Sequence, residues 1–233
     1  MIRFGEPCHR RMVFLIPLMV VMAGGSIVPN LSAVAADGPI PLPAIGKGVF
    51  LVASPQLQDP NFRQTVVLLC EHGSKGTVGI IVNRQTDLLL SEVLPDLTTL
   101  KGTSYRLFWG GPVQPTAVLM LFRVVHPPGE SRPVMEGVFL GGNPDLLDRL
   151  IMHPEPTETF HAYAGYAGWG PGQLEAEMAS GAWATVKADS KSVFDKDPAQ
   201  LWPDLLERLT APRVLTDSPQ ATSPPVSDRQ TGR

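Results

Sequence analysis

Cys70 and His72 are the two side chains of this sequence that could act as a nucleophile and its base. A cysteine attacks as the thiolate and needs a base within hydrogen-bond reach. Both residues lie in a run typical of a β-strand, where residues two apart point to the same face, so we expect them on one face. The pattern fits equally a buried cysteine beside a histidine at the mouth of a hairpin, and we favour that interpretation.

The histidines of the predicted domain do not form a metal-binding pattern. His72, His126, His153 and His161 are widely separated, and neither His-Glu-x-x-His nor Cys-x-x-Cys spacing occurs. We therefore predict no metal site and no cofactor.

Glu175 and Glu177 are a pair of carboxylates that could do acid–base chemistry. They fall in a predicted helix, where successive residues are rotated by about 100°, so the two side chains should diverge. Glu175, close to the start of that helix, more simply interacts with free amides and the helix dipole.

Two glycine-rich segments, Gly110-Gly111-Pro112 and Gly170-Pro171-Gly172, could hold an anion on main-chain N–H groups. The second precedes a helix that we expect to start at Pro171, where N–H groups are free. Neither segment matches the phosphate-binding patterns GxGxxG or GxxxxGK, so we predict tight structural turns. We expect the whole segment 165–175, with four glycines, to follow an irregular path.

A binding surface is the remaining candidate, and its predicted residues are Asn61, His72, Asn83, Trp169 and Gln173. In the segment Asp59-Pro60-Asn61-Phe62 the two polar side chains should bond the main chain of a turn while the phenylalanine anchors it to the core. Asn83, at the end of a strand, could play the same part. The four tryptophans, at 109, 169, 183 and 202, are expected mainly in the core.

Alternating short apolar runs and capped helices indicate how these residues are positioned. Helices are expected over 87–94, capped by Asp87, and over 143–151, 171–180 and 197–209. Pro203 could move the start of the last helix to Trp202. Strands are expected over 49–54, 65–71, 77–83, 105–109, 117–125, 137–140, 159–165 and 183–188. This mixture predicts an α/β domain, bordering on α+β, with a three-layer arrangement.

The N-terminal residues have the pattern of an export signal. Residues 1–35 combine a basic start, an uncharged apolar run over 12–25 and small residues at Ala33 and Ala35. We predict a cleaved signal peptide and a periplasmic or secreted protein; the alternative is an inner-membrane anchor through residues 12–25. Cleavage would leave Cys70 as the only cysteine, so no internal disulfide could form.

Three further segments follow the signal. We predict a proline-rich linker over residues 36–45, the folded domain over residues 46–212, and a disordered tail, rich in Ser, Thr and Pro, over residues 213–233. The whole chain carries a net charge of −3; without the three arginines and one glutamate of residues 1–35, 16 basic and 21 acidic residues give −5. This acidic balance argues against nucleic acid as a partner.

Several ordered motifs resemble the YqgE/AlgH family. The first block is Leu51–Pro55, Asp59–Phe62, Thr65–His72 and Gly79–Arg84; the later blocks are Gly110–Val113 and Gly165–Glu175 with Trp183. The resemblance implies a single compact domain whose mixed, bifurcated sheet curls toward a pseudo-barrel. It implies no established activity, although some members carry the name of a transcriptional regulator. Gln85 stands where the family usually has proline, and the family generally lacks an export signal.

Three functions follow as hypotheses. The first is an exported, non-enzymatic binding module with an unknown protein or small-molecule partner. The second is a hydrolase that uses Cys70 or His72, and the third is a transcriptional regulator, which rests on the family name alone. Contact with a membrane is expected only through the N-terminal segment, if it is not cleaved.

Overall fold

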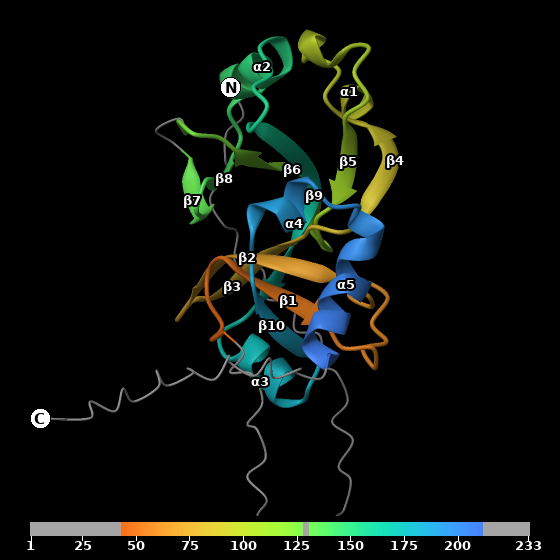
Figure 1. Cartoon of the computed structure of the whole chain (residues 1–233), viewed down its shortest axis with the longest axis vertical. Coiled ribbons are helices and arrows are strands. Elements are labelled where there is room, and N and C mark those ends of the chain that lie inside the picture. The colour runs from red at the N-terminus through yellow and green to blue at the C-terminus, as the bar shows by residue number, and fades with distance from the viewer. Residues whose placement is uncertain (1–42, 128–130, 212–233) are drawn as a thin grey trace, which may run out of the picture. The chain divides into compact units, whose positions relative to one another are not determined.

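The computed structural model describes residues 43–127 and 131–211, and the chain folds there into one compact α/β domain (Figure 1). The predicted signal peptide, the alternative anchor, most of the linker and the tail at 213–233 lie outside the described residues. Within the part that is described, no helix is both long and apolar enough to cross a membrane.

Within residues 43–127 and 131–211, ten strands form one mixed sheet. They are β1 (Val49–Ala53), β2 (Val66–Gly73), β3 (Gly76–Ile81), β4 (Gln85–Leu89), β5 (Arg106–Trp109), β6 (Val113–Arg123), β7 (Arg132–Met135), β8 (Val138–Gly141), β9 (Thr159–Trp169) and β10 (Trp183–Lys187). The pairing order is β10-β1-β2-β3-β9-β6-β8-β7, and β4 joins through β5, which pairs with β9.

The long strand β9 divides the sheet into two branches. Its last residues pair antiparallel with β3, as in Val78 opposite Gly168. Its earlier residues pair parallel with β5 on one edge and antiparallel with β6 on the other, so that both Phe108 and Leu119 lie opposite Tyr163. The predicted bifurcated sheet is therefore confirmed, with β9 as the shared strand.

The sheet curls but does not close. Among the described residues, β10 and β7, the two ends of the strand order, do not pair with each other. Strand β7 nevertheless folds back over β2, and Val134 joins the apolar cluster that contains Val66 and Leu68.

Helices cover both faces of the β1-β2-β3 branch because the strands are apolar on both faces. Phe50 and Leu68 face α4 (Ser190–Phe194) and α5 (Pro198–Thr210), which contribute Val193, Leu201 and Leu205. On the opposite face, the alternate residues of the same strands pack against Trp169, Trp183 and Leu174 of α3 (Gln173–Ala179). This arrangement confirms the three-layer prediction.

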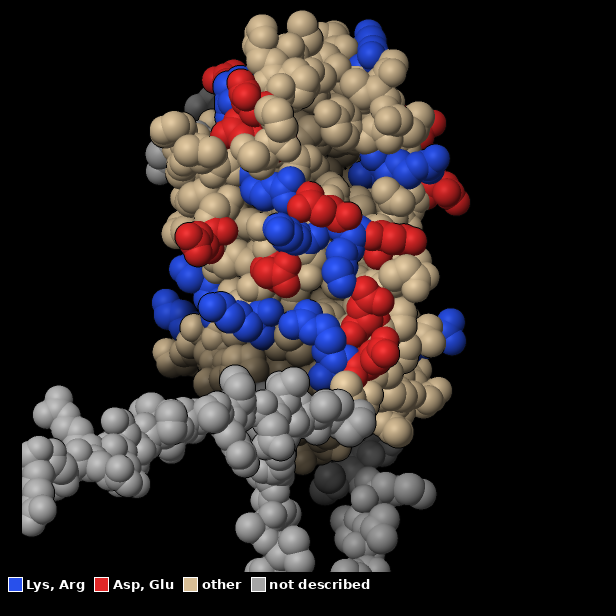
Figure 2. Space-filling view, viewed as in Figure 1, with Lys and Arg blue, Asp and Glu red and all other residues tan. Residues whose placement is uncertain are grey.

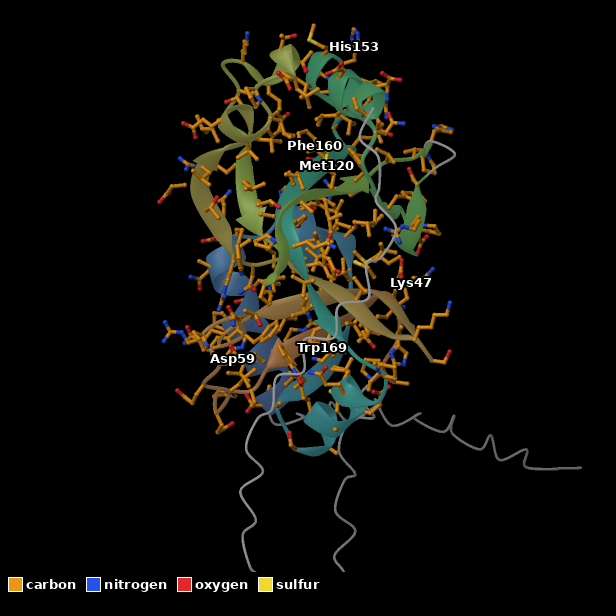
Figure 3. All side chains as sticks on the ribbon, turned by 180° about the vertical axis from the view of Figure 1, so that it is seen from behind. Lys47, Asp59, Met120, His153, Phe160 and Trp169 are labelled. Atoms are coloured by element: carbon orange, nitrogen blue, oxygen red, sulfur yellow. The ribbon has the colours of Figure 1, made fainter. Side chains whose placement is uncertain are left out.

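A separate apolar cluster fills the other branch. It joins α1 (Leu90–Val93), the 3₁₀ turn η1 (Thr98–Leu100) and α2 (Pro144–Met152) to strands β5, β6 and β9. Met120 and Phe160 of this cluster lie in the upper half of Figure 3, and Asp59 and Trp169 lie in the lower half.

Two predicted helix starts are confirmed by their caps. The Asn143 side chain accepts a hydrogen bond from the Leu146 N–H at 2.8 Å, and Asp197 accepts one from the Ala199 N–H at 3.0 Å. Because Asp197 caps the last helix and Pro198 is its first residue, the alternative start at Trp202 is wrong. Pro203 lies inside the helix.

The predicted helix over 87–94 is largely wrong. Residues 85–89 form β4, which pairs with β5, and only Leu90–Val93 are helical. Asp87 is not the cap; the Glu92 carboxylate instead accepts a hydrogen bond from the Leu89 N–H at 2.9 Å. Pairing with a neighbouring strand has overridden the local helical pattern.

The glycine-rich segment 165–175 is more regular than expected. Strand β9 continues through it to Trp169, because residues 167–169 pair with β3. Helix α3 then starts at Gln173 rather than Pro171, after Gly172 in the left-handed conformation with a φ of 75°. Only residues 170–172 form the tight turn that the glycines predicted. Strand β7 and helix α4 were not predicted at all.

Candidate functional site

An open groove with a volume of about 760 Å³ lies on the described part of the chain. We call it the β4–α5 groove. Its walls come from the start of β4, the end of β5, the start of α5 and the loop before β2. Asn61, Asn83 and Arg84 line it together with Gln85, Thr86, Trp109 and the α5 residues Asp197, Pro198 and Ala199. Two of the five predicted binding residues, Asn61 and Asn83, thus belong to it.

Asn83 serves the scaffold rather than the groove. Its Oδ1 accepts a hydrogen bond from the Val66 N–H at 2.8 Å, and its Nδ2 donates to the Gln64 carbonyl at 3.0 Å. Gln64 has a φ of 56°, a left-handed conformation that is uncommon outside glycine. The Asn83 amide therefore holds a strained residue in place, as the sequence predicted for a turn.

Arg84 fixes the same loop from the other side. Its guanidinium donates to the carbonyls of Asn61 at 2.8 Å, Pro60 at 3.2 Å and Arg63 at 3.0 Å. Partial burial lowers the pKa of Arg84, with a further contribution from Arg63. Because one side chain binds three carbonyls, the loop has a defined main-chain path.

Phe62 anchors the loop, as expected. The Asp59 carboxylate accepts a hydrogen bond from the Asn61 N–H at 2.8 Å and so closes the turn. The Phe62 ring then packs between two indoles, with centroids 6.0 Å from Trp169 and 5.6 Å from Trp183. The side chain of Asn61 is left exposed at the rim of the groove.

Trp169 and Gln173 belong to a second polar cluster, centred on Glu177. Glu177 Oε2 accepts hydrogen bonds from the indole N–H of Trp169 at 3.0 Å and of Trp183 at 2.9 Å. Glu177 Oε1 accepts one from Gln173 Nε2 at 2.9 Å, and Gln173 Oε1 accepts one from the Gly170 N–H at 3.1 Å. These groups bind one another, so the cluster ties α3 to the sheet.

His72 lies on the same face of the sheet as the Glu177 cluster, whereas Cys70 lies on the other face. A bulge between Leu69 and Glu71 shifts the register of β2 against β3. His72 Nδ1 lies 2.8 Å from Thr77 Oγ1, and Nε2 lies 3.8 Å from the Glu175 carboxylate. Cys70 points into the cluster beneath α5 on the opposite face. The expectation that the two side chains share a face is wrong, because the extra residue breaks the period of two.

Cys70 is buried, and burial raises the pKa of its thiol to about 12. We expect it to react with iodoacetamide at neutral pH about a thousandfold more slowly in the folded chain than after unfolding in guanidinium, because so little thiolate forms. Peptide mapping by mass spectrometry would follow Cys70 separately from Cys8. Labelling of Cys70 at equal rates in both states would contradict this expectation.

No set of three or more metal-ligating side chains lies together in residues 43–127 and 131–211. His153 lies at the upper end, far from Asp59 and Trp169 in Figure 3.

Glu175 and Glu177 diverge as predicted. Glu175 points toward His72, and Glu177 points toward the indoles of Trp169 and Trp183.

The two glycine turns are occupied by the protein's own groups. Gly110 packs against the main chain of Gly165: a Cβ atom at position 110 would lie 2.2 Å from the Gly165 carbonyl oxygen. At the other turn, the Gly170 N–H is bonded to Gln173. Both therefore act as structural turns, as predicted.

His161 is a half-buried titratable residue to which the sequence analysis assigned no role. Its ring packs between Phe108 at 4.6 Å and Phe194 at 5.1 Å, and its Nδ1 lies 3.4 Å from the hydroxyl of the fully buried Tyr163. Burial, and then the charge of Arg123, lower the pKa of His161 to about 4. Nothing in its sequence neighbourhood distinguishes it from a surface histidine.

This shift gives stability a defined pH dependence. The unfolded chain takes up a proton on His161 below its ordinary value of 6.5, whereas the folded chain does so only near 4. The free energy of unfolding should therefore fall by up to about 3 kcal/mol as the pH drops from 6.5 to 4. Urea denaturation between pH 6.5 and pH 4 would measure this fall. In His161→Gln the free energy of unfolding should depend less steeply on pH. An unchanged slope in that variant would assign the effect to other groups.

The five predicted binding residues thus form two groups rather than one surface pocket. Asn61 and Asn83 line the β4–α5 groove, and His72, Trp169 and Gln173 lie around α3. Phe62 connects the groups through its contact with Trp169.

Comparison with known proteins assigns the folded domain to a protein family. Residues 50–213 match the family described as DUF179, AlgH-like. The chain belongs to this AlgH-like family. The resemblance found in its motifs is thereby confirmed over the full length of the domain.

Individual AlgH-like relatives agree with this assignment. A UPF0301 protein of Thioalkalivibrio sulfidiphilus is 40% identical over 163 residues, covering 69% of this chain and 87% of that protein. A UPF0301 protein of Myxococcus xanthus is 39% identical over 158 residues, covering 65% and 84%. Neither name states an activity.

Two solved structures share the fold. The AlgH protein from Pseudomonas aeruginosa is 31% identical with a TM-score of 0.59, over 71% of this chain and 89% of that chain. A protein from Corynebacterium diphtheriae is 22% identical with a TM-score of 0.61, over 72% and 90%, which shows likeness of fold alone.

Proposed function

We propose that this AlgH-like protein is a non-enzymatic binding protein whose ligand lies in the β4–α5 groove. The observation that carries the proposal is the lining: the exposed, uncharged polar side chains of Asn61 and Gln85 line the groove together with the half-buried indole of Trp109. Binding sites commonly combine an aromatic surface with a few hydrogen-bonding groups. The ligand should be polar and uncharged where it touches this wall.

The rigidity of the loop supports the same proposal. Asn83, Arg84 and Phe62 hold residues 59–64 by side-chain contacts, so the wall that carries Asn61 is formed before any ligand arrives. A pre-formed wall lowers the conformational entropy lost on binding.

The groove does not favour an anion. The early amides of α5 are already bonded, since the Ala199 N–H donates to the Asp197 carboxylate and the Gln200 N–H to the Asp197 carbonyl. The three carbonyls bound by Arg84 likewise occupy its guanidinium.

The hydrolase alternative has less support. The Cys70 thiol is buried, and His72 lies on the other face of β2. The regulator alternative has little support either, because residues 36–233 carry 16 basic and 21 acidic side chains. On the face seen in Figure 2, a row of basic side chains is bordered by acidic ones.

Blocking the groove tests the proposal. Ala199 is exposed in the groove, so Ala199→Arg should fill it, whereas Ala199→Ser should leave it open. Wild type and both variants would be used to capture proteins and small molecules from a bacterial envelope fraction, with identification by mass spectrometry. We expect ligands retained by wild type and the serine variant but lost from the arginine variant. Equal retention by all three would place binding elsewhere.

We also propose that the chain is exported, on the basis of the signal pattern in residues 1–35. A chain lacking those residues should stay in the cytoplasm, whereas the full chain should lose the signal and appear in the periplasm or medium. Fractionation and N-terminal sequencing would measure both. Retention of residues 12–25 in a membrane fraction would support the anchor instead.

A further inference from the structure

We infer that the occupant of the β4–α5 groove is an extended peptide segment, which adds to the free edge of β4 by main-chain hydrogen bonds. This inference rests on the proposed function of the groove and names the class of partner. Three observations support it: the register of β4 against β5, the position of the groove, and the intramolecular hydrogen bonds that occupy the rest of the edge of β4.

The register shows that Gln85 presents its main chain outward. Gln85 lies opposite Phe108, and the neighbouring Trp109 N–H donates to the Arg84 carbonyl at 2.8 Å. Antiparallel pairs alternate between hydrogen-bonded and non-bonded pairs. Since Arg84 and Trp109 are bonded, the N–H and C=O of Gln85 must point away from β5. Asn83, two residues earlier, also has no main-chain hydrogen bond to any described residue.

The groove follows this edge. Gln85 and Thr86 are the first two residues of β4, and both line the groove, which therefore lies beside the start of this edge strand. A polypeptide matches such an edge because it offers alternating N–H and C=O groups at the same spacing.

The remainder of β4 is closed to a partner. The Thr86 hydroxyl accepts a hydrogen bond from the Leu88 N–H at 3.3 Å, and Glu92 accepts the one from Leu89. Arg106 donates to the Asp87 carbonyl at 2.9 Å. Intramolecular bonds of this kind prevent indiscriminate edge pairing. The open section is thus confined to the stretch beside the groove, where Trp109 can receive an apolar side chain of the peptide.

A main-chain contact can be separated from a side-chain contact by two substitutions at one position. Gln85→Pro removes the outward N–H, and proline is tolerated where an edge-strand N–H faces outward. Gln85→Ala keeps the N–H and removes the side-chain amide. Peptides would be selected from a random octapeptide phage library on the purified full chain, with counter-selection on Ala199→Arg. Affinities of synthetic peptides would then be measured by calorimetry, and folding of each variant by its thermal midpoint.

We expect Gln85→Pro to weaken the selected peptides by about tenfold or more and Gln85→Ala by less than about threefold. N-methylation at every second residue of the peptide should abolish binding, whereas N-methylation at the residues between them should not. This readout does not depend on the folding of a variant. Binding should also slow hydrogen exchange of the Gln85 amide.

The opposite results would overturn the inference. A larger loss with Gln85→Ala than with Gln85→Pro would mean recognition by side chains in the groove. Failure to select any peptide, while the groove still retains envelope ligands that Ala199→Arg loses, would reject a peptide but keep the proposed function. Exchange protection of Gln85 that depends on protein concentration, or on residues 213–233, would assign the edge to a second copy or to the chain's own tail.

Discussion

Gly110→Ala should unfold this domain or cost it more than about 4 kcal/mol of stability. The added Cβ atom would lie 2.2 Å from the Gly165 carbonyl oxygen and 3.0 Å from the Tyr163 Cβ, both in the centre of β9. Two main-chain segments cannot move apart there without breaking pairing, because the Gly110 N–H donates to the Ala164 carbonyl and the Ile81 N–H donates to the Gly110 carbonyl. Circular dichroism and urea denaturation would measure the loss.

Gly73→Ala is the matched control. A Cβ atom at position 73 would meet no atom within 4 Å, and this glycine does not have a positive φ. The free energy of unfolding of this variant should stay within about 0.5 kcal/mol of the wild-type value. If Gly110→Ala unfolded at the same urea concentration as the wild type, β5 and β9 would be able to separate at this point, and the described pairing of the two branches would be wrong.

Glu177→Ala should destabilise the folded chain by about 2–4 kcal/mol. The indole N–H groups of Trp169 and Trp183 both donate to one Glu177 oxygen, and both rings are only 5% exposed. Removing the acceptor leaves two nearly buried donors without a partner, at about 1–3 kcal/mol each, partly relieved by entering water. Urea denaturation followed by tryptophan fluorescence would measure it.

Two neighbouring changes separate this effect from a general effect of charge on α3. Glu177→Gln keeps one acceptor oxygen and should cost about half as much. Glu175→Ala removes an exposed carboxylate 3.8 Å from His72 and should cost less than about 0.5 kcal/mol. Equal losses at positions 175 and 177 would show that the two indoles do not depend on Glu177.

Elements with a strong local cause could be predicted from the sequence. The apolar run before Cys70 is buried on both faces and predicts a central strand, and Asn143 and Asp197 cap their helices as their side chains dictate. Strand β7 escaped prediction because it has only four residues and contains Pro133, which argues against a strand. Its strand conformation depends on pairing with β8.

The glycine-rich end of β9 shows why local patterns can mislead. Glycine is unfavourable in strands, so the segment around Gly165 and Gly168 predicted an irregular path. Glycine is required at position 165 because the main chain of Gly111 approaches it too closely for any side chain, whereas a Cβ atom at position 168 would make only ordinary contacts. That approach joins residues more than fifty positions apart, and no local pattern reveals it.

Only part of the candidate site could be predicted, because contacts between residues distant in sequence also build this site. The loop role of Asn61 and Asn83 follows from their side chains, whereas the walls of the groove come from Gln85, Trp109 and Ala199, which are distant in sequence. The bulge that separates Cys70 from His72 is likewise set by pairing with β3 and leaves no mark on the sequence of β2.

The late position of β9 has a consequence for synthesis of the chain. Strands β3, β5 and β6 precede it by tens of residues, yet each has β9 as a neighbour. A nascent chain that has not reached residue 169 therefore holds three strands with an unfilled edge and an exposed apolar face. Contacts of such long separation form slowly, so the polypeptide should stay loosely structured until most of it has left the ribosome.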